Sequence, residues 1–225
     1  MNRNSFGAAI NILQEASLGL VSVRMSKIAY HLDYFAFPLV IAFCLYFGRG
    51  KYGLLSTACL FTLGLMFWTL AEYFLHRFVL HGWPFFAKFH QAHHDDPHAL
   101  IAAPTVFSLG IFAGIALLPA TLLAGLWPAL PWFAGFLSGY LAFGTIHHIV
   151  HHSESQHVVI RHFKKFHARH HHGTDGQNFG VLTSFWDRVF GTYEIPKRKG
   201  ARDQHPALPQ TIWSRWNRKS RSRAI

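Results

Sequence analysis

Four long apolar intervals constrain the fold more than any other feature of the sequence. They span about 28–47, 54–75, 104–127 and 129–150, each close to the ~20 residues with which a helix crosses a bilayer. Because a backbone in lipid must satisfy its own hydrogen bonds, such a chain folds as membrane helices. The sequence therefore predicts an all-α integral membrane protein with about four transmembrane helices. The first interval contains Pro38, and a re-entrant or interfacial segment is its alternative interpretation.

The segments on either side of this membrane domain, residues 28–195, differ from it in composition. Residues 1–27 are mildly amphipathic and have no compact apolar core followed by a small-residue cleavage site, so we expect a surface helix or a loose segment there. Residues 196–225 are basic and contain Trp213 and Trp216. We interpret them as an interfacial or disordered tail.

The distribution of charge predicts the orientation in the membrane. The chain has 21 basic and 10 acidic residues, a net charge of +11, and fourteen of the basic residues follow Ser153. Positive charge favours the cytoplasmic side, which predicts both termini there, in the endoplasmic reticulum of a eukaryote or the inner membrane of a bacterium. Arg49 and Lys51, between the first two intervals, favour the opposite orientation. Anionic headgroups account for the basic residues, so we expect no nucleic-acid partner.

Most histidines gather next to the ends of the second and fourth apolar intervals. Of 18 in the chain, ten lie between Thr145 and Gly173 and six lie in the segment that follows Glu72. A single histidine on a helix is usually a surface or hydrogen-bonded residue. The joint occurrence of several spaced groups at membrane boundaries is instead typical of a metal site, and we expect the two clusters to build one site.

The spacing of the histidines indicates how they share helix faces. Residues three and four apart lie on one face of a helix, which applies to His90, His93 and His94 and again to His167, His170 and His171. Pairs four apart end the fourth interval, as His147 with His151 or as His148 with His152. His76 and His81 are five apart and would not converge on a straight α-helix. Their spacing predicts a helix end near His81.

Two carboxylates near the histidines have alternative roles. Glu72 lies four residues before His76 and shares its helix face. A membrane carboxylate needs a partner, which is either the ring N–H of His76 or the side chain of Arg77. Asp187 is interpreted as a helix cap or as an acceptor for a ligand's second nitrogen, with a simple surface feature beside Arg188 as the alternative.

The number of imidazoles exceeds what one metal ion needs. A zinc site uses three or four protein ligands, so eight or more histidines suffice for two ions. Imidazole binds Fe, Zn, Cu and Ni alike, and ligand type alone leaves the metal open. The location beside the membrane favours a lipid substrate, for which two redox metals can activate O2 to attack an unactivated C–H bond.

These motifs resemble a known family. Four histidine motifs, here called boxes in chain order, precede the segment NFGVLTSFWDRVFGTYE: HRFVLH, FHQAHH, IHHIVHH and FHARHH. Together they are similar to the fatty acid hydroxylase and sterol desaturase superfamily, most of all to its fatty acid 2-hydroxylase branch. The similarity covers about Glu72 to Glu194. It implies a four-helix membrane unit capped by a cytosolic helical region that holds two metal ions.

The resemblance also implies the residues of the site. Its metal ligands would be His76, His81, His90, His93, His94, His147, His151, His167, His170 and His171. In the third box the family pattern favours His147 and His151, and the alternative register is His148 and His152. Glu72 and Asp187 are expected to support the ligands. The histidines at 31, 98, 157, 162 and 205 belong to no box, and His172 is left undecided.

The implied activity is O2-dependent hydroxylation of a fatty acyl or related lipid chain by two iron ions, for which zinc is a possible substitute. Electrons would come from a separate protein that resembles cytochrome b5 or a ferredoxin. One alternative is hydroxylation or desaturation of a sterol or carotenoid within the same superfamily. Another is a membrane metal-binding protein without enzymatic activity, which would line a route inside the spans with histidines.

Overall fold

A computed structural model describes residues 23–174 and 176–194. The predicted N-terminal segment lies outside these residues except for its last five positions. The predicted basic tail, 196–225, and His205 within it also lie outside the described residues.

Four helical segments are long and apolar enough to cross a membrane. They are Lys27–Arg49, Leu54–Leu80, Thr105–Ala124 and Leu126–His152. The chain is therefore a multi-pass membrane protein, and the predicted all-α fold with four membrane helices is confirmed. The first segment is helical throughout its apolar part, because α3 (Asp33–Gly48) continues through Pro38.

The four segments are built from shorter elements. The first contains α2 (Lys27–His31) before α3, and the second joins α4 (Leu54–Phe74) to a π-helix, η1 (Leu75–Leu80). The third consists of α6 (Thr105–Phe112), a second π-helix, η2 (Ala113–Leu117), and α7 (Leu118–Ala124). The fourth is one continuous helix, α8 (Leu126–His152).

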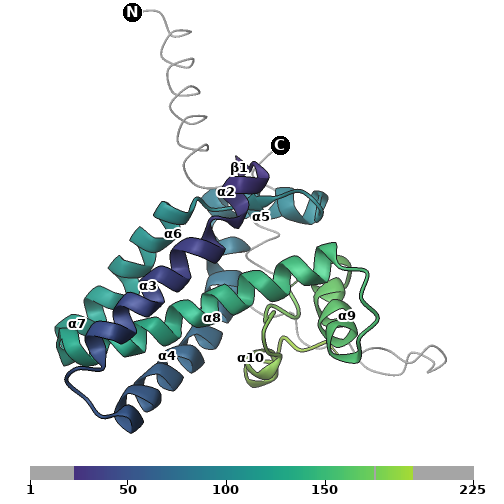
Figure 1. Cartoon of the computed structure of the whole chain (residues 1–225). Coiled ribbons are helices and arrows are strands. Elements are labelled where there is room, and N and C mark those ends of the chain that lie inside the picture. The colour runs from purple at the N-terminus through teal and green to yellow at the C-terminus, as the bar shows by residue number, and fades with distance from the viewer. Residues whose placement is uncertain (1–22, 175, 195–225) are drawn as a thin grey trace, which may run out of the picture.

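Three further helices cap one end of this membrane unit. They are α5 (Pro84–Asp95), α9 (Val158–His172) and α10 (Phe185–Val189). Figure 1 shows them at the end where α4 and α8 finish, away from the turn that joins α3 to α4. A two-residue strand, β1 (Val23–Arg24), pairs antiparallel with β2 (Ile101–Ala102) and fixes the start of the described chain to the cap.

The turn between the third and fourth membrane segments differs from the prediction. The predicted intervals 104–127 and 129–150 place it near residue 128, whereas α8 begins at Leu126 and that residue is helical. The chain reverses at Gly125, whose φ of 86° lies in the left-handed region that glycine adopts without steric cost. Pro128 is tolerated because the first turn of a helix leaves its N–H groups unpaired.

Helix α8 is the centre of the membrane unit and packs against α4 and α3. Small residues allow the close approach: a Cβ on Gly64 of α4 would collide with the backbone of α8, and one on Gly135 of α8 would collide with α4. Above this contact Trp68 packs edge-to-face on Phe136, with ring centroids 5.1 Å apart. This packing fixes the ends of α4 and α8 relative to each other, where the histidines lie.

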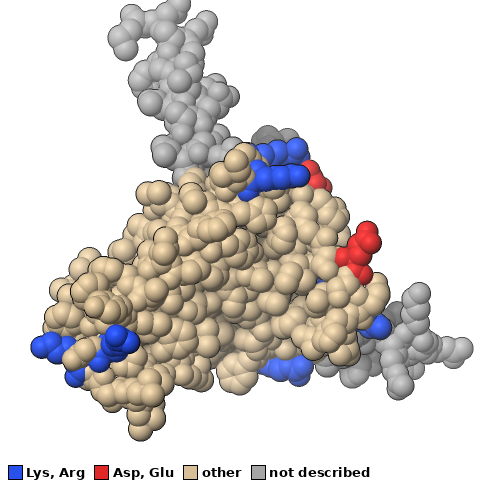
Figure 2. All heavy atoms as spheres, in the orientation of Figure 1, with Lys and Arg blue, Asp and Glu red and all other residues tan. Residues whose placement is uncertain are grey.

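The outer surface of the membrane helices is apolar. Figure 2 shows a broad region without charged side chains across the face where α3 and α8 lie, with charged residues near its ends. Large hydrophobic side chains point outward from all parts of the bundle, among them Leu39 at 71% exposure, Leu55 at 79% and Leu123 at 88%. Such exposure is costly in water but is the normal surface of a helix in lipid.

Candidate metal centre

The first histidine pair lies on the π-helix η1. A π-helix forms i→i+5 hydrogen bonds, and the N–H of His81 donates to the carbonyl of His76 at 3.1 Å. The wide turn places the two rings 5.2 Å apart. The helix ends at Leu80, which confirms the predicted end near His81. The convergence of the pair depends on the π turn, which the sequence analysis did not anticipate.

Helix α5 directs its histidines to two sides. Its first turn starts with Pro84, whose missing N–H has no cost there. Nε2 of His90 lies 2.9 Å from Nε2 of His76. The ring of His93 instead lies 4.8 Å from that of His151. The histidines of this one HxxHH box therefore approach two different sets of rings, one near His76 and one near His151.

The ends of α8 and α9 meet through their histidines. Nε2 of His167 lies 2.8 Å from Nε2 of His151 and 3.0 Å from Nε2 of His171. From the same face of α9, Nε2 of His170 lies 3.0 Å from Nε2 of His81. Like α5, α9 therefore faces both the π-helix and α8.

Nine histidines form two groups, in each of which one ligand atom per residue lies within 4.8 Å of the others. The five-histidine group consists of His93, His147, His151, His167 and His171, and the four-histidine group consists of His76, His81, His90 and His170. His94 lies between them, with Nε2 3.1 Å from Nε2 of His90 and its ring stacked on His171 at 4.2 Å. The structure thus brings all ten histidines of the implied ligand set together.

The donor atoms fit metal ions. Two nitrogens that bind one ion at about 2.1 Å and at right angles lie about 3.0 Å apart, and the Nε2 pairs described above are separated by 2.8 to 3.1 Å. Nε2 of His93 is buried and has no hydrogen-bond partner within the described residues. A buried imidazole nitrogen without a partner is costly unless a ligand satisfies it.

The cap histidines are held in the neutral form that binds metals. Burial, with nearby imidazoles adding to it, lowers the pKa of His81, His93 and His170 to about 3 and that of His171 to about 2. Burial likewise lowers the pKa of His90 and His167 well below the ordinary value. At neutral pH these rings are therefore uncharged, and each has one nitrogen without a proton, as metal binding requires.

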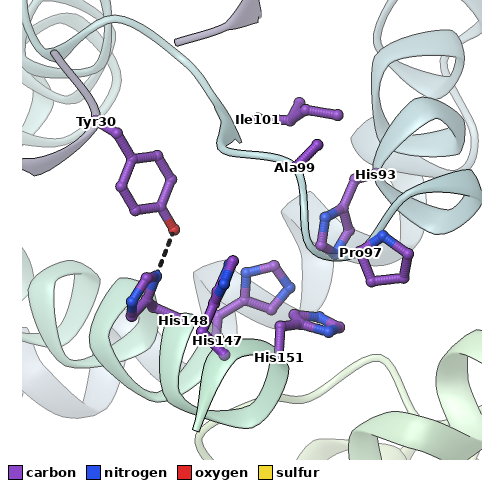
Figure 3. Close-up of a pocket in the computed structure, with 9 residues that line it drawn as sticks. Tyr30, His93, Pro97, Ala99, Ile101, His147, His148 and His151 are labelled. Carbon is purple, nitrogen blue, oxygen red and sulfur yellow. Dashed lines mark hydrogen bonds between the residues drawn. The ribbon is translucent and has the colours of Figure 1, made fainter. Parts of the chain in front are cut away.

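The third box contributes to the five-histidine group through His147 and His151. Figure 3 shows these two rings beside His93, around a cavity of about 10 Å³, roughly the volume that one water requires. His148 contacts the hydroxyl of Tyr30, with Nδ1 3.3 Å from the oxygen. His152 stacks on His148 at 4.3 Å. His148 and His152 also line this cavity, but neither belongs to either group. The geometry therefore favours the first register.

The histidines without a box lie outside the two groups. His31 contacts the backbone carbonyl of Lys27, at 2.7 Å from Nδ1. The others that the structure describes are exposed: His98, His157, His162 and His172. His172, left undecided by the sequence, belongs to neither group.

The two carboxylates have a different role from the ones considered. Oε1 of Glu72 accepts from the backbone N–H groups of Val181 at 2.5 Å and Leu182 at 3.1 Å. The expected contact with His76 or Arg77 is therefore replaced by contacts with a loop. The reason is that residues 177–182 pass beside α4, and their N–H groups need a buried acceptor.

Asp187 holds the same loop from the other side. Its Oδ1 accepts from the N–H of Phe179 at 2.7 Å, and its Oδ2 accepts from the N–H of Gly180 at 2.9 Å. Burial raises the pKa of Asp187, and these hydrogen bonds act in the opposite direction. Asp187 contacts no histidine ring through these bonds, so neither expected role describes it.

The acceptors for the ligand rings are backbone carbonyls that the sequence analysis missed. Nδ1 of His76 donates to the carbonyl of Phe179 at 2.5 Å, and Nδ1 of His170 donates to the carbonyl of Gln177 at 3.1 Å. Each bond fixes the ring orientation and leaves Nε2 as the metal-binding atom. Every residue has a carbonyl, so only the family-like NFGVL segment marked this region in the sequence.

Comparison with known proteins agrees with this arrangement of histidines. The profile of the fatty acid hydroxylase family matches residues 61–192, more than half of the 225 residues. The chain belongs to the fatty acid hydroxylase family. The match covers both histidine groups and the loop that holds them.

Individual relatives within this family match the chain over part of their own length. A ceramide very long chain fatty acid hydroxylase of Saccharomyces cerevisiae, SCS7, is 39% identical over 62% of this chain and 39% of its own length. A dihydroceramide fatty acyl 2-hydroxylase of Arabidopsis thaliana is 33% identical over 63% of this chain and 62% of its own. The chain thus spans roughly two to three fifths of these relatives.

A solved structure shares the fold. The hydroxylase domain visible in the structure of full-length Scs7p superposes with a TM-score of 0.68 at 30% sequence identity, over 76% of this chain and 68% of the other. The chain and the hydroxylase domain of Scs7p therefore share the membrane bundle and its histidine-bearing cap.

Proposed function

We propose that this chain is a membrane-bound, O2-dependent hydroxylase of a fatty acyl chain that uses two iron ions, with zinc as a possible substitute. The observation that carries the proposal is the pair of adjoining imidazole groups at one end of four apolar helices. Their ten candidate ligands are the histidines of the four boxes. The family of the chain supports the reaction class.

The proposed reaction has a definite balance. Iron in the two groups would supply O2 activation, in which R–H, O2, two electrons and two protons give R–OH and H2O. The electrons require a separate donor protein, for which a cytochrome b5-like or ferredoxin-like protein is proposed. No described residue is needed as a redox group in this scheme.

The chain's own residues have three tasks in this scheme. Neutral imidazoles bind the ions, and the carbonyls of Gln177 and Phe179 orient two of these rings. The cap helices α5 and α9 cover the site from one side, and the buried ring of Phe179 lies 5.5 to 5.8 Å from the rings of His76, His81 and His170. This surrounding reduces access of water to the reacting groups.

The proposed acyl chain lies along α8. A groove of about 380 Å³ is lined by Ser138, Leu141, Ala142, Thr145 and Ile146. Its lining is mostly apolar, its volume is within the range of ligand sites, and it runs along α8, the helix that also carries His147 and His151. The names of the relatives specify ceramide or dihydroceramide fatty acyl chains, and we propose a substrate of that lipid class.

The proposed orientation places the metal groups and both termini on the cytoplasmic side. The ends of α4 and α8 lie on one side because two membrane crossings separate them. The excess of Lys and Arg after Ser153 supports the cytoplasmic assignment. In a eukaryote this membrane would be the endoplasmic reticulum, and in a bacterium the inner membrane.

Two measurements test the proposed function. Protein purified without oxygen should contain about two iron ions per chain, since each histidine group offers enough ligands for one. Cells that express the chain, supplied with ¹⁸O2, should gain ¹⁸O-labelled hydroxyacyl lipids. A metal content near zero would contradict the metal assignment, and labelled sterols or carotenoids in place of acyl lipids would contradict the substrate.

A further inference from the structure

The loop 177–182 joins two carboxylates to two metal-facing imidazoles. Four consecutive N–H groups of this loop, at Phe179, Gly180, Val181 and Leu182, donate to Asp187 or Glu72. Two loop carbonyls, at Gln177 and Phe179, accept from Nδ1 of His170 and His76. The carbonyl of Phe179 and the N–H of Gly180 belong to one peptide group, which links Asp187 to the acceptor of His76, and Glu72 binds the next two N–H groups of the loop.

Both carboxylates are rigidly placed. Glu72 and Asp187 have exposures of 3% and 0%, and Asp187 accepts a third hydrogen bond from Thr192 at 2.8 Å. Thr192 in turn contacts the hydroxyl of Tyr73 on α4 at 3.0 Å. These hydrogen bonds fix the loop to the membrane segment Leu54–Leu80, which also carries His76.

The loop contacts only one of the two groups in this way. His76 and His170 both belong to the four-histidine group. In the five-histidine group, Nδ1 of His167 and of His171 is buried without a hydrogen-bond partner in the described parts of the chain. The carboxylates therefore act on one group, although the two groups adjoin.

We propose that Glu72 and Asp187 are positioning residues that orient His76 and His170 through the loop 177–182 and thereby set the metal affinity of the four-histidine group alone. The inference rests on the metal-binding role proposed above. Loss of a group that orients a ligand typically lowers metal affinity 10- to 100-fold. The loss of metal affinity should therefore affect only the ion bound by the four-histidine group.

The decisive experiment compares metal binding in two backgrounds. Glu72→Leu is combined with His151→Ala and His167→Ala, which reduce the five-histidine group to three ligands, and separately with His81→Ala and His90→Ala, which reduce the four-histidine group to two. Iron affinity, measured by competition with a chelator, should fall 10- to 100-fold in the first background and stay unchanged in the second. Equal losses in both, or no loss in either, would overturn the proposal.

Conservative variants distinguish positioning from a general structural effect. Glu72→Gln keeps the Oε1 acceptor and should restore the affinity that Glu72→Leu loses. Glu154→Leu, a change at an exposed carboxylate between α8 and α9, is the matched control and should alter neither group. If Glu72→Leu does not accumulate in membranes, Asp187→Asn tests the same loop, because it removes the acceptor for one of its N–H groups.

A measurement without metal separates this inference from the proposed function. In the metal-free chain with ¹⁵N-labelled histidine, NMR should find His76 and His170 protonated on Nδ1, and Glu72→Leu should make both rings exchange between tautomers. Wild-type protein that binds no iron would end the proposed function while this test still decides the loop's role. Unchanged tautomers in Glu72→Leu would overturn the inference even if iron binds.

Discussion

The two histidine groups use the same ligand type but are supported differently. The four-histidine group lies against the π-helix and a clamped loop, and two of its outer nitrogens have backbone acceptors. The five-histidine group lies between the ends of α5, α8 and α9, and its buried outer nitrogens at His167 and His171 have no partner among the described residues. Hydrogen bonds orient rings of the four-histidine group. The five-histidine group relies on the packing of its helices and has one more histidine.

This difference indicates how two adjoining metal sites can acquire unequal properties. Ligand identity is the same in both, so ligand type cannot distinguish the ions. Orientation of the outer nitrogen changes ligand basicity and metal affinity. Unequal support therefore gives the chain a way to tune one ion without changing the other.

Removal of one ligand from each group should have the largest effect. His170→Ala and His167→Ala should each lower the iron content from about two ions per chain to about one and abolish product formation. The measurements are metal analysis and the ¹⁸O2 lipid assay. His162→Ala, on the exposed side of the same helix, should retain both ions. Loss of both ions in either ligand variant would mean that the groups bind as one unit.

Filling the groove on α8 should have the next largest effect and should leave both groups intact. Ala142→Phe adds a ring to a groove of about 380 Å³ and should lower turnover of long acyl chains by roughly 10-fold, equivalent to about 1.4 kcal/mol in the barrier. Iron content should not change. Leu123→Phe, at a position 88% exposed on α7, is the control. Equal turnover in both variants would remove the groove from the substrate path.

A change in the backbone of the loop should produce a smaller and one-sided effect. Asn178 has a φ of 55°, a conformation that costs most L-residues about 1–2 kcal/mol. Asn178→Val should therefore loosen the loop and lower iron affinity at the four-histidine group. Asn178→Gly also loses the side chain but tolerates the backbone angle, so it is the matched comparison. The assay is chelator competition, and equal losses in Val and Gly variants would exclude the backbone cause.

The alternative register of the third box should have the smallest effect. His148→Ala removes a contact with Tyr30, for which about 1 kcal/mol of stability is an ordinary value. Both ions and most of the activity should remain. His147→Ala, at the next position, should instead lose an ion. Metal analysis of the two variants decides between the registers, and loss of an ion from His148→Ala would reverse the assignment.

Some of this centre could be predicted from local spacing alone. His90, His93 and His94 share a helix face because residues three and four apart do so in any α-helix. That face is divided between two groups in the structure, since His90 approaches His76 while His93 approaches His151. Spacing predicts which rings can point the same way, and it contains no information about what stands opposite them.

The carboxylates illustrate the limit more clearly. The spacing of Glu72 and His76 predicts a shared helix face, yet Glu72 accepts hydrogen bonds from backbone N–H groups more than a hundred residues later in the chain. Asp187 was recognised as a residue near the site, but its acceptor role depends on a turn that folds Phe179 and Gly180 onto it. Contacts to backbone atoms leave no side-chain pattern in a sequence.

By itself, the sequence determined the membrane fold and the residues gathered at one boundary. Apolar length dictates helices in lipid, because no other structure satisfies the backbone there, and histidine spacing dictates shared faces. The tertiary structure decided which rings belong to which group, which register of the third box faces them, and which groups hold them. These features depend on the π turn at His76 and on contacts between distant segments, which arise only when the helices pack.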